Sequence, residues 1–341
     1  MIQLFVRVLW CCLFLVTPLQ SLCQKQLTAS SIPSDSLTVN SIAFGPNGVV
    51  YAATEDGIYR SKNNGELWQV NGRSEDFTQC TGVAVNSKGH IFVSTNGAGI
   101  HRSKDGGDSW THVDTVLHNN HSRSVAINSR DQVFISASVG VEEFVFRSND
   151  NGVHWLYEPS TRYYTFRQIV VDNRDRLYVH TANGLLSSAD NGDNRIEFLP
   201  GVKMTYFGQD KTSIAVDSLG TVFSGSGYAV VYRTTDEGST WIMLRPSTDS
   251  TLVVTALAAT RNGLVFAGLN SGSLMKSADR GDHWTRTSLQ MSNKKGVLCI
   301  SISPVGYIFV GTLEGGIFRS TDMGQTWMKI NRGFVKIQYD E

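Results

Sequence analysis

The sequence predicts an all-β protein built from seven copies of one four-stranded antiparallel unit. Three observations support this prediction. A short polar motif recurs about every 43 residues between Ser61 and Trp327, short apolar runs flank each copy, and no window shows a sustained 3.6-residue apolar period. A repeat of this length is typical of propeller blades and of other repeat arrays.

The motif consists of a Ser or Thr, an Asp two residues later, a Gly two residues further and a Trp after three more. Five copies are intact: SKDGGDSW, SNDNGVHW, TTDEGSTW, SADRGDHW and STDMGQTW. The first copy, SKNNGELW, has Asn in the Asp place, and the fourth, SADNGDNR, has Arg195 in the Trp place. The anchor residues are Asn63, Asp105, Asp150, Asp190, Asp236, Asp279 and Asp322, and the tryptophans are Trp68, Trp110, Trp155, Trp241, Trp284 and Trp327.

Around each motif the same order of elements recurs. The first copy, NSIAFGPNGVVYAATEDGIYRSKNNGELWQV, has an apolar run, a turn, a second run that ends in small residues, and a Gly-containing link. A third run, GIYRS, leads into the motif, and a fourth begins at the Trp. Runs of about five residues between turn residues predict antiparallel strands, with the motif as the hairpin between the third and fourth.

Each motif residue has a structural role that needs no ligand. The hydroxyl and the carboxylate can hydrogen-bond the backbone of a turn, the Gly allows positive φ, and the Trp supplies an apolar ring for packing. The acidic fourth copy also lacks the spacing of an EF-hand calcium loop. We therefore expect seven hairpin turns rather than metal or catalytic sites, and we expect Ile196 or Phe198 to fill the space of the missing Trp.

The pattern S/T-x-D-x-G-x-x-W resembles the Asp-box, or BNR repeat, of sialidases, sortilin-type receptor domains, xyloglucanases and photosystem II assembly factors. The resemblance covers almost the whole chain after residue 37. It implies a seven-bladed β-propeller of four-stranded blades over residues 37–331, followed by a C-terminal tail, 332–341. These relatives include enzymes, receptors and assembly factors, so the repeat alone assigns no function.

The first 23 residues resemble a secretory signal. They contain one early Arg, an apolar run from Val8 to Val16 and small residues before a cleavage point at Gln24. This predicts a secreted or periplasmic protein with an N-terminal extension over 24–36 and no membrane span after cleavage. A lipoprotein anchored through Cys23 is disfavoured because bulky Leu22 precedes it. Cys80 and Cys299 would remain, on blades that are not neighbours, so we expect free thiols.

Charge and motif content exclude several classes of function. Removal of the signal would remove Arg7 and no acidic residue, which leaves 29 basic and 30 acidic side chains. No basic stripe is present, so nucleic acid is not an expected partner. No phosphate-binding glycine loop precedes a helix, so we expect no cofactor. We expect a monomer.

Irregular loops concentrate in blades three to five, on the face opposite the motif turns. They are SVGVEEF, YEPSTRYYTFRQ and LPGVKMTYFGQDKTS. Aromatic rings interleaved with charged groups suit a protein or glycan surface, although the rings could instead pack on the blades. The leading hypothesis is an exported binding or scaffold protein. The predicted binding residues are Tyr157, Arg162, Tyr163, Tyr164, Arg167, Lys203, Tyr206 and Phe207.

The alternative is a sialidase-like or xyloglucanase-like glycoside hydrolase that acts on extracellular glycans. Such an enzyme needs two carboxylates across a cleft, and the candidates are Glu142 or Glu143 with Asp210. Adjacent strand residues point to opposite faces, so at most one of the two glutamates should face the channel. The string Phe166-Arg167-Gln168-Ile169 lacks the Pro of a sialidase motif. The segment with His112, Asp114, His118 and His121 has no tight ligand spacing, so no metal is expected.

Overall fold

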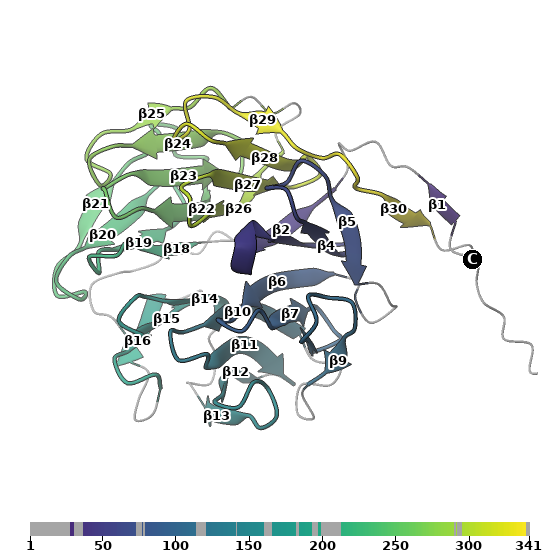
Figure 1. The fold of residues 1–341 in the computed structure, drawn as a ribbon. Helices are drawn as coiled ribbons and strands as arrows, with labels where there is room; N and C mark the ends of the chain where they lie inside the picture. The colour runs from purple at the N-terminus through teal and green to yellow at the C-terminus, as the bar shows by residue number, and fades with distance from the viewer. Residues whose placement is uncertain are drawn as a thin grey trace, which may run out of the picture.

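The chain forms a seven-bladed β-propeller of four-stranded antiparallel blades, as predicted. The computed structural model describes residues 28–30, 37–72, 77, 79–113, 121–140, 142–159, 166–181, 184–192, 197–198, 213–289, 291 and 295–338. The blades surround a central channel, and the first strand of each lies nearest the axis (Figure 1). Within the described residues, the single helical segment is the 3-10 turn η1 (Pro46–Gly48).

Each blade takes its four strands from one continuous stretch of chain. Blade one is β2 (Val39–Phe44), β3 (Val50–Thr54), β4 (Gly57–Ser61) and β5 (Gln69–Gly72). Blade two is β6 (Cys80–Val85), β7 (Ile91–Thr95), β8 (Ile100–Ser103) and β9 (Thr111–His112). Blade three is β10 (His121–Ile127), β11 (Val133–Val139), β12 (Glu142–Ser148) and β13 (Leu156–Pro159). Blade four is β14 (Phe166–Val171), β15 (Leu177–Thr181), β16 (Gly184–Ser188) and β17 (Glu197–Phe198).

The remaining blades repeat this order. Blade five is β18 (Ile214–Val216), β19 (Val222–Gly225), β20 (Val231–Thr234) and β21 (Ile242–Leu244). Blade six is β22 (Val254–Ala259), β23 (Val265–Leu269), β24 (Leu274–Ser277) and β25 (Thr285–Arg286). Blade seven is β26 (Val297–Ile302), β27 (Ile308–Thr312), β28 (Gly316–Ser320) and β29 (Met328–Lys329). Outside the blades, β1 (Thr28–Ser30) pairs antiparallel with β30 (Lys336–Gln338).

The core lies between the blades. The second strands are apolar runs such as VYAAT and IFVST, and all five residues of each are buried. A strand that is covered on both faces favours such a continuous apolar run over strict alternation. The buried hydrophobic residues form seven clusters, one at each seam between neighbouring blades. The seams therefore carry most of the apolar packing.

The repeated motif closes the hairpin between the third and fourth strands. In blade three, Ser148 Oγ donates to Asp150 Oδ1 at 2.9 Å and accepts the Gly152 amide at 2.7 Å. Asp150 Oδ1 also accepts the His154 amide at 2.9 Å. Gly152 has φ +81, and a Cβ there would lie 3.2 Å from Val113. All polar groups of this turn are engaged in the hairpin itself.

The seams are also joined by side chains of the third strands. Arg319 Nη1 donates to the Asn64 carbonyl at 2.6 Å and closes the ring between blades seven and one. Five other seams have the same kind of bond, donated by Arg60, Arg102, Arg147, Arg233 and Lys276. At the seam between blades four and five the corresponding position is Ser187. There Arg176 pairs with Glu237 of the next blade at 3.0 Å.

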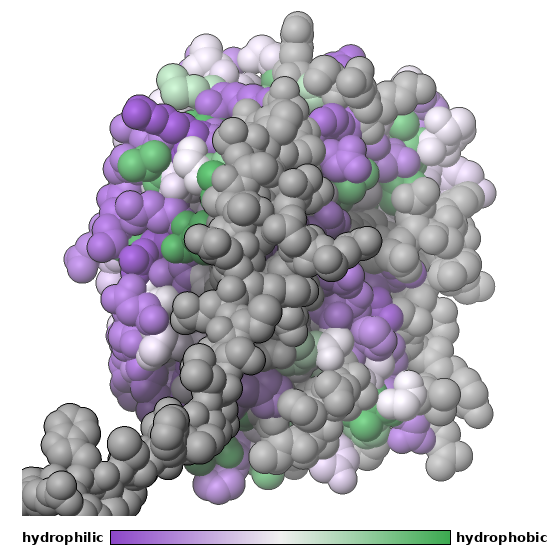
Figure 2. Space-filling model, turned by 90° about the vertical axis from the view of Figure 1, so that its right-hand side faces the viewer, coloured by the Kyte–Doolittle hydropathy of each residue, from purple (hydrophilic) through white to green (hydrophobic). Residues whose placement is uncertain are grey.

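The outer rim near the paired strands β1 and β30 is largely polar. Figure 2 shows this side, which is the right-hand side of Figure 1, with mostly hydrophilic described residues and scattered hydrophobic ones. Both described cysteines are free: Cys80 is buried, which raises its thiol pKa, and Cys299 is partly buried. Neither feature marks a site on this side, so attention falls on the channel.

Candidate binding site at the channel mouth

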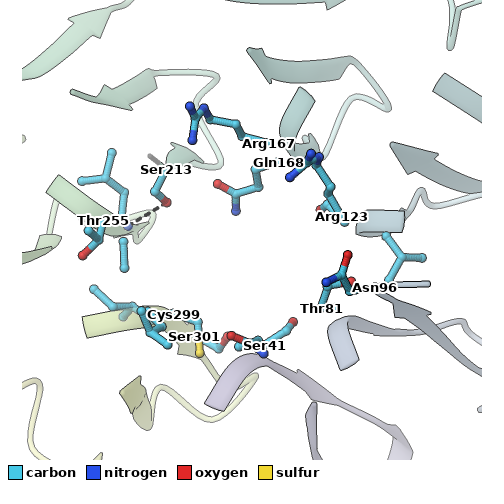
Figure 3. Close-up of a pocket in the computed structure, with 18 residues that line it drawn as sticks. Ser41, Thr81, Asn96, Arg123, Arg167, Gln168, Ser213, Thr255, Cys299 and Ser301 are labelled. Carbon is cyan, nitrogen blue, oxygen red and sulfur yellow. Dashed lines mark hydrogen bonds between the residues drawn. The ribbon is translucent and has the colours of Figure 1, made fainter. Parts of the chain in front are cut away.

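The innermost strands enclose a cavity of about 330 Å³ on the propeller axis. Its described lining residues come from the first halves of the inner strands, near the ends that face the links between second and third strands. Figure 3 looks into this opening and shows a ring of hydroxyl, amide and guanidinium groups. The aliphatic part of the wall comes from residues such as Val125, Leu257 and Ile300.

Many of these polar side chains hold the blades together. One hydroxyl or amide of each inner strand hydrogen-bonds the backbone of the next blade's inner strand, with distances from 2.5 to 3.3 Å. These bonds form a closed ring with one member at every seam. The seven residues are Ser41, Thr81, Ser124, Gln168, Ser213, Thr255 and Ser301. Their polarity is therefore explained by ring architecture and does not itself indicate a ligand.

Two arginines on neighbouring blades add positive charge to this ring. Arg123 lies on β10 and Arg167 on β14, and both side chains project from the wall toward the opening (Figure 3). Each lies at a register shift near the start of its strand, between Ser122 and Ser124 in one case and between Phe166 and Gln168 in the other. A β-bulge re-aims a side chain and is common beside functional sites. The bulges thus direct both guanidinium groups into the channel.

The same bulge position holds uncharged residues in other blades. Register shifts leave Asn40, Thr81, Thr255 and Leu298 at the corresponding places of blades one, two, six and seven. Positive charge at the described channel wall is therefore confined to blades three and four. This agrees with the half of the propeller where the sequence has its irregular loops.

Glu143 lies behind Arg123. Its Oε1 is 3.9 Å from Arg123 Nε and accepts the Ser138 hydroxyl at 2.8 Å. Burial raises the pKa of the Glu143 carboxyl, while the Ser138 hydrogen bond and the Arg123 charge partly oppose that rise. A carboxyl with a raised pKa neutralises Arg123 less completely than an ordinary carboxylate would. The Arg123 side chain remains 37% exposed and can meet a ligand.

A buried histidine stands near the second arginine. His180 on β15 is 1% exposed, and burial together with the Arg167 charge lowers its pKa to about 3. A neutral imidazole adds no positive charge, so the excess at the mouth comes from the two arginines. No Asp or Glu occurs among the described residues that line the cavity. The mouth is consequently suited to an anionic group.

The structure brings together only part of the predicted site. Arg167 lines the cavity, whereas Tyr157 lies on the outermost strand of blade three, packed on Phe144 and Phe146. Arg162, Tyr163, Tyr164, Lys203, Tyr206 and Phe207 lie outside the described residues.

The candidate catalytic carboxylates do not line the cavity where they are described. Glu142 is exposed and Glu143 is buried beside Arg123, so the two adjacent side chains do face opposite ways. Asp210, like Asp114 and His118 of the histidine-rich segment, lies outside the described residues. His121 Nδ1 is 2.5 Å from Asn96 Oδ1. In the described part of the chain, no cluster of three metal-ligating side chains occurs.

Sequence reasoning missed Arg123. It sits in HSRSVAI, a strand rather than a conspicuous loop, and it resembles any polar residue of an alternating strand. An alignment of the seven repeats by their motifs would have placed it opposite Arg167, because both stand at the first-strand bulge.

Comparison with known proteins identifies the fold. No family model matches the sequence, and no curated protein matches it. Among solved structures, a GH74 xyloglucanase from Xanthomonas campestris has a TM-score of 0.72 at 15% identity and covers 90% of this chain. YCF48 bound to a D1 peptide has a TM-score of 0.69 at 14% identity, over 86% of this chain and 94% of that one.

Other similar structures belong to larger proteins. The extracellular domain of a protein described as a one-component system from B. thetaiotaomicron has a TM-score of 0.66 at 14% identity over 87% of this chain. This chain spans 56% of the xyloglucanase structure and 40% of that extracellular domain. At these identities the similarity establishes a shared β-propeller fold and nothing further. No helix among the described residues is long and apolar enough to cross a membrane.

Proposed function

We propose that the protein is a binding or scaffold protein that holds a carboxylate-bearing segment of a partner polypeptide at the channel mouth. One observation carries the proposal: Arg123 and Arg167 enter the cavity from neighbouring inner strands, and no described lining residue is acidic. A guanidinium group binds a carboxylate through parallel charge-assisted hydrogen bonds, which adds both strength and directional specificity. Two such groups side by side favour a carboxylate over a neutral ligand.

A polypeptide is favoured over a glycan by the character of the wall. The described lining residues are hydroxylic, amide-bearing or aliphatic, and none is aromatic. Sugar rings usually stack on aromatic side chains, which this part of the channel does not offer. YCF48 has been solved with a D1 peptide on a propeller of similar shape, so the fold is compatible with peptide binding. The glycoside hydrolase alternative has less support, because no described lining residue is a carboxylate.

The proposal includes the setting in which the protein acts. The repeats belong to the Asp-box type, the propeller spans residues 37–331, and the first 23 residues direct export and are removed. The partner is then an extracytoplasmic protein. Support comes from the motif spacing and from the apolar N-terminal run. The loop residues Tyr163, Tyr164, Tyr206 and Phe207 would surround the mouth and contact the residues that flank the bound carboxylate.

The test compares a free carboxylate with its amide. A fluorescent peptide library with acidic residues and free C-termini is screened by anisotropy, and each hit is measured again with its carboxylates amidated. The double variant Arg123→Gln/Arg167→Gln should lose at least tenfold in affinity, since a hydrogen bond to a charged group contributes about 1.5–3 kcal/mol and 1.4 kcal/mol is a factor of ten. Arg245→Gln, an exposed arginine outside the channel, is the matched control.

The outcomes separate clearly. Hits that bind equally well when amidated, or that bind the double variant as tightly as the original protein, would refute the assignment. Release of reducing sugar from sialosides or xyloglucan would favour the hydrolase instead. Thermal melts of all variants show whether a loss of binding comes from unfolding.

A further inference from the structure

Six of the seven seams contain a tryptophan indole in the same place. The Trp of each motif packs against the second-strand aromatic residue of the preceding blade. Trp110 lies with Tyr51, Trp155 with Phe92, Trp241 with Tyr178, Trp284 with Phe223, Trp327 with Phe266 and Trp68 with Phe309. The indole is thus a standard part of the seam.

The indole is also oriented by a hydrogen bond. The Nε1 groups of Trp68, Trp110 and Trp155 donate to carbonyls of the preceding blade's fourth strand at 2.7 to 2.8 Å. In all three cases the acceptor is the third residue after that blade's own Trp. Each socket therefore combines an aromatic wall with one backbone acceptor.

The seam between blades three and four has the socket without a described tryptophan. Its core cluster contains Phe134, the equivalent of the aromatic residues above, but no Trp among the described residues. Beside Phe134 the structure has a cavity of about 240 Å³. Its described lining includes Val145, Leu177, Tyr157 and Gly192. By position in the repeat, Glu158 on β13 would supply the carbonyl acceptor.

The size and walls of this cavity suit an indole ring. An apolar cavity of about 150 Å³ holds benzene, so one of this size accommodates the larger bicyclic ring. The third-strand bond from Arg147 Nη1 to the Asn191 carbonyl, 3.0 Å, fixes one side of the opening. The other side is apolar and open: Leu156 is 56% exposed and Tyr157 is 55% exposed.

We propose that this socket binds the tryptophan side chain of an exposed segment of a partner polypeptide. The chain's own repeats supply the complementarity, because six equivalent seams accept an indole that arrives on a polypeptide backbone. Residues beside the partner's Trp would cover Leu156 and Tyr157, whose exposure leaves an apolar surface continuous with the socket. The site lies at the seam of two blades, separate from the channel mouth, and does not depend on the function proposed above.

The first probe is N-acetyl-tryptophanamide, with N-acetyl-alaninamide as its matched control. Saturation-transfer NMR and calorimetry measure binding to the full chain. The variant Arg195→Trp restores the repeat's own residue at a position outside the described residues, and Tyr157→Ala removes an exposed lining residue. Val153→Trp, at an exposed position of the blade-three motif, controls for the addition of an indole.

We expect saturable binding of the tryptophan probe alone, a loss of at least tenfold in Arg195→Trp with an equal or higher Tm, and a several-fold loss in Tyr157→Ala. Val153→Trp should bind like the original protein. Absence of saturable binding, or unchanged binding in Arg195→Trp, would overturn the proposal.

Two further results would also overturn it. A lower Tm in Arg195→Trp, combined with no probe binding by the original protein, would mean that the chain's own residues fill the socket. Self-association of the original protein that disappears in Arg195→Trp would assign the socket to a second copy. If Arg195→Trp does not fold, unchanged binding in Tyr157→Ala would decide against the site.

Discussion

The substitution Ser148→Ala tests how the motif turns stabilise the propeller. The Ser148 hydroxyl is fully buried, accepts the Gly152 amide at 2.7 Å and donates to Asp150 at 2.9 Å. Its removal leaves the Gly152 N–H without that acceptor, and an unsatisfied buried donor costs about 1–3 kcal/mol. Asp150 keeps its bond from the His154 amide, so the aspartate side adds little. We therefore expect a loss of about 2 kcal/mol.

The assay is thermal unfolding of Ser148→Ala beside Asp150→Asn. At ~2.1 cal/mol/K per residue over roughly 300 residues, a loss of 2 kcal/mol lowers Tm by about 3 °C. Asp150→Asn should cost less, because blade one already uses Asn63, whose Oδ1 accepts the Leu67 amide at 2.9 Å. A Ser148→Ala protein with an unchanged Tm, or an Asp150→Asn protein that is the less stable of the two, would refute this explanation of the turn.

Three further predictions concern ring closure and pH. Arg319→Met removes the bond to the Asn64 carbonyl and should lower Tm by a few degrees in a calorimetric scan. Ser187→Arg supplies the third-strand donor that the seam between blades four and five lacks, so Tm should rise by about 1–2 °C; a fall would contradict the seam model. In acid, hydrogen bonds hold the pKa of Asp236 at about 2, mainly from Thr240, and bonds from His154 outweigh partial burial to give Asp150 the same value. Because these folded-state values lie below 3.8, the stability they contribute is complete above about pH 4 and disappears as pH falls toward 2, which urea midpoints across that range would show.

The fold was predictable because its information is local and repeated. A motif that recurs seven times specifies a turn, and the runs on either side specify strands whose burial follows from stacking between blades. Residues at the second strand, such as Tyr51 and Phe92, are buried as their apolar runs indicate.

The candidate site was less predictable because it depends on how separate blades meet. Arg123 and Arg167 are 44 positions apart in the chain, and only the closed ring and two register shifts direct them into one cavity. Tyr157, by contrast, stands in an aromatic-rich segment but lies on an outer strand beside the empty socket. Composition identified the correct part of the ring, whereas the direction of each side chain required the sheet geometry.

The central claim is that Arg123 and Arg167 together hold a carboxylate at the channel mouth. NMR of the arginine Nε–H groups, assigned with the single Arg→Gln variants, would follow both side chains during titration with the best carboxylate peptide. The account predicts that the two signals shift together and saturate with the same Kd, while the amidated peptide leaves them unchanged. Shifts confined to exposed arginines such as Arg245, with both channel signals unmoved, would contradict it.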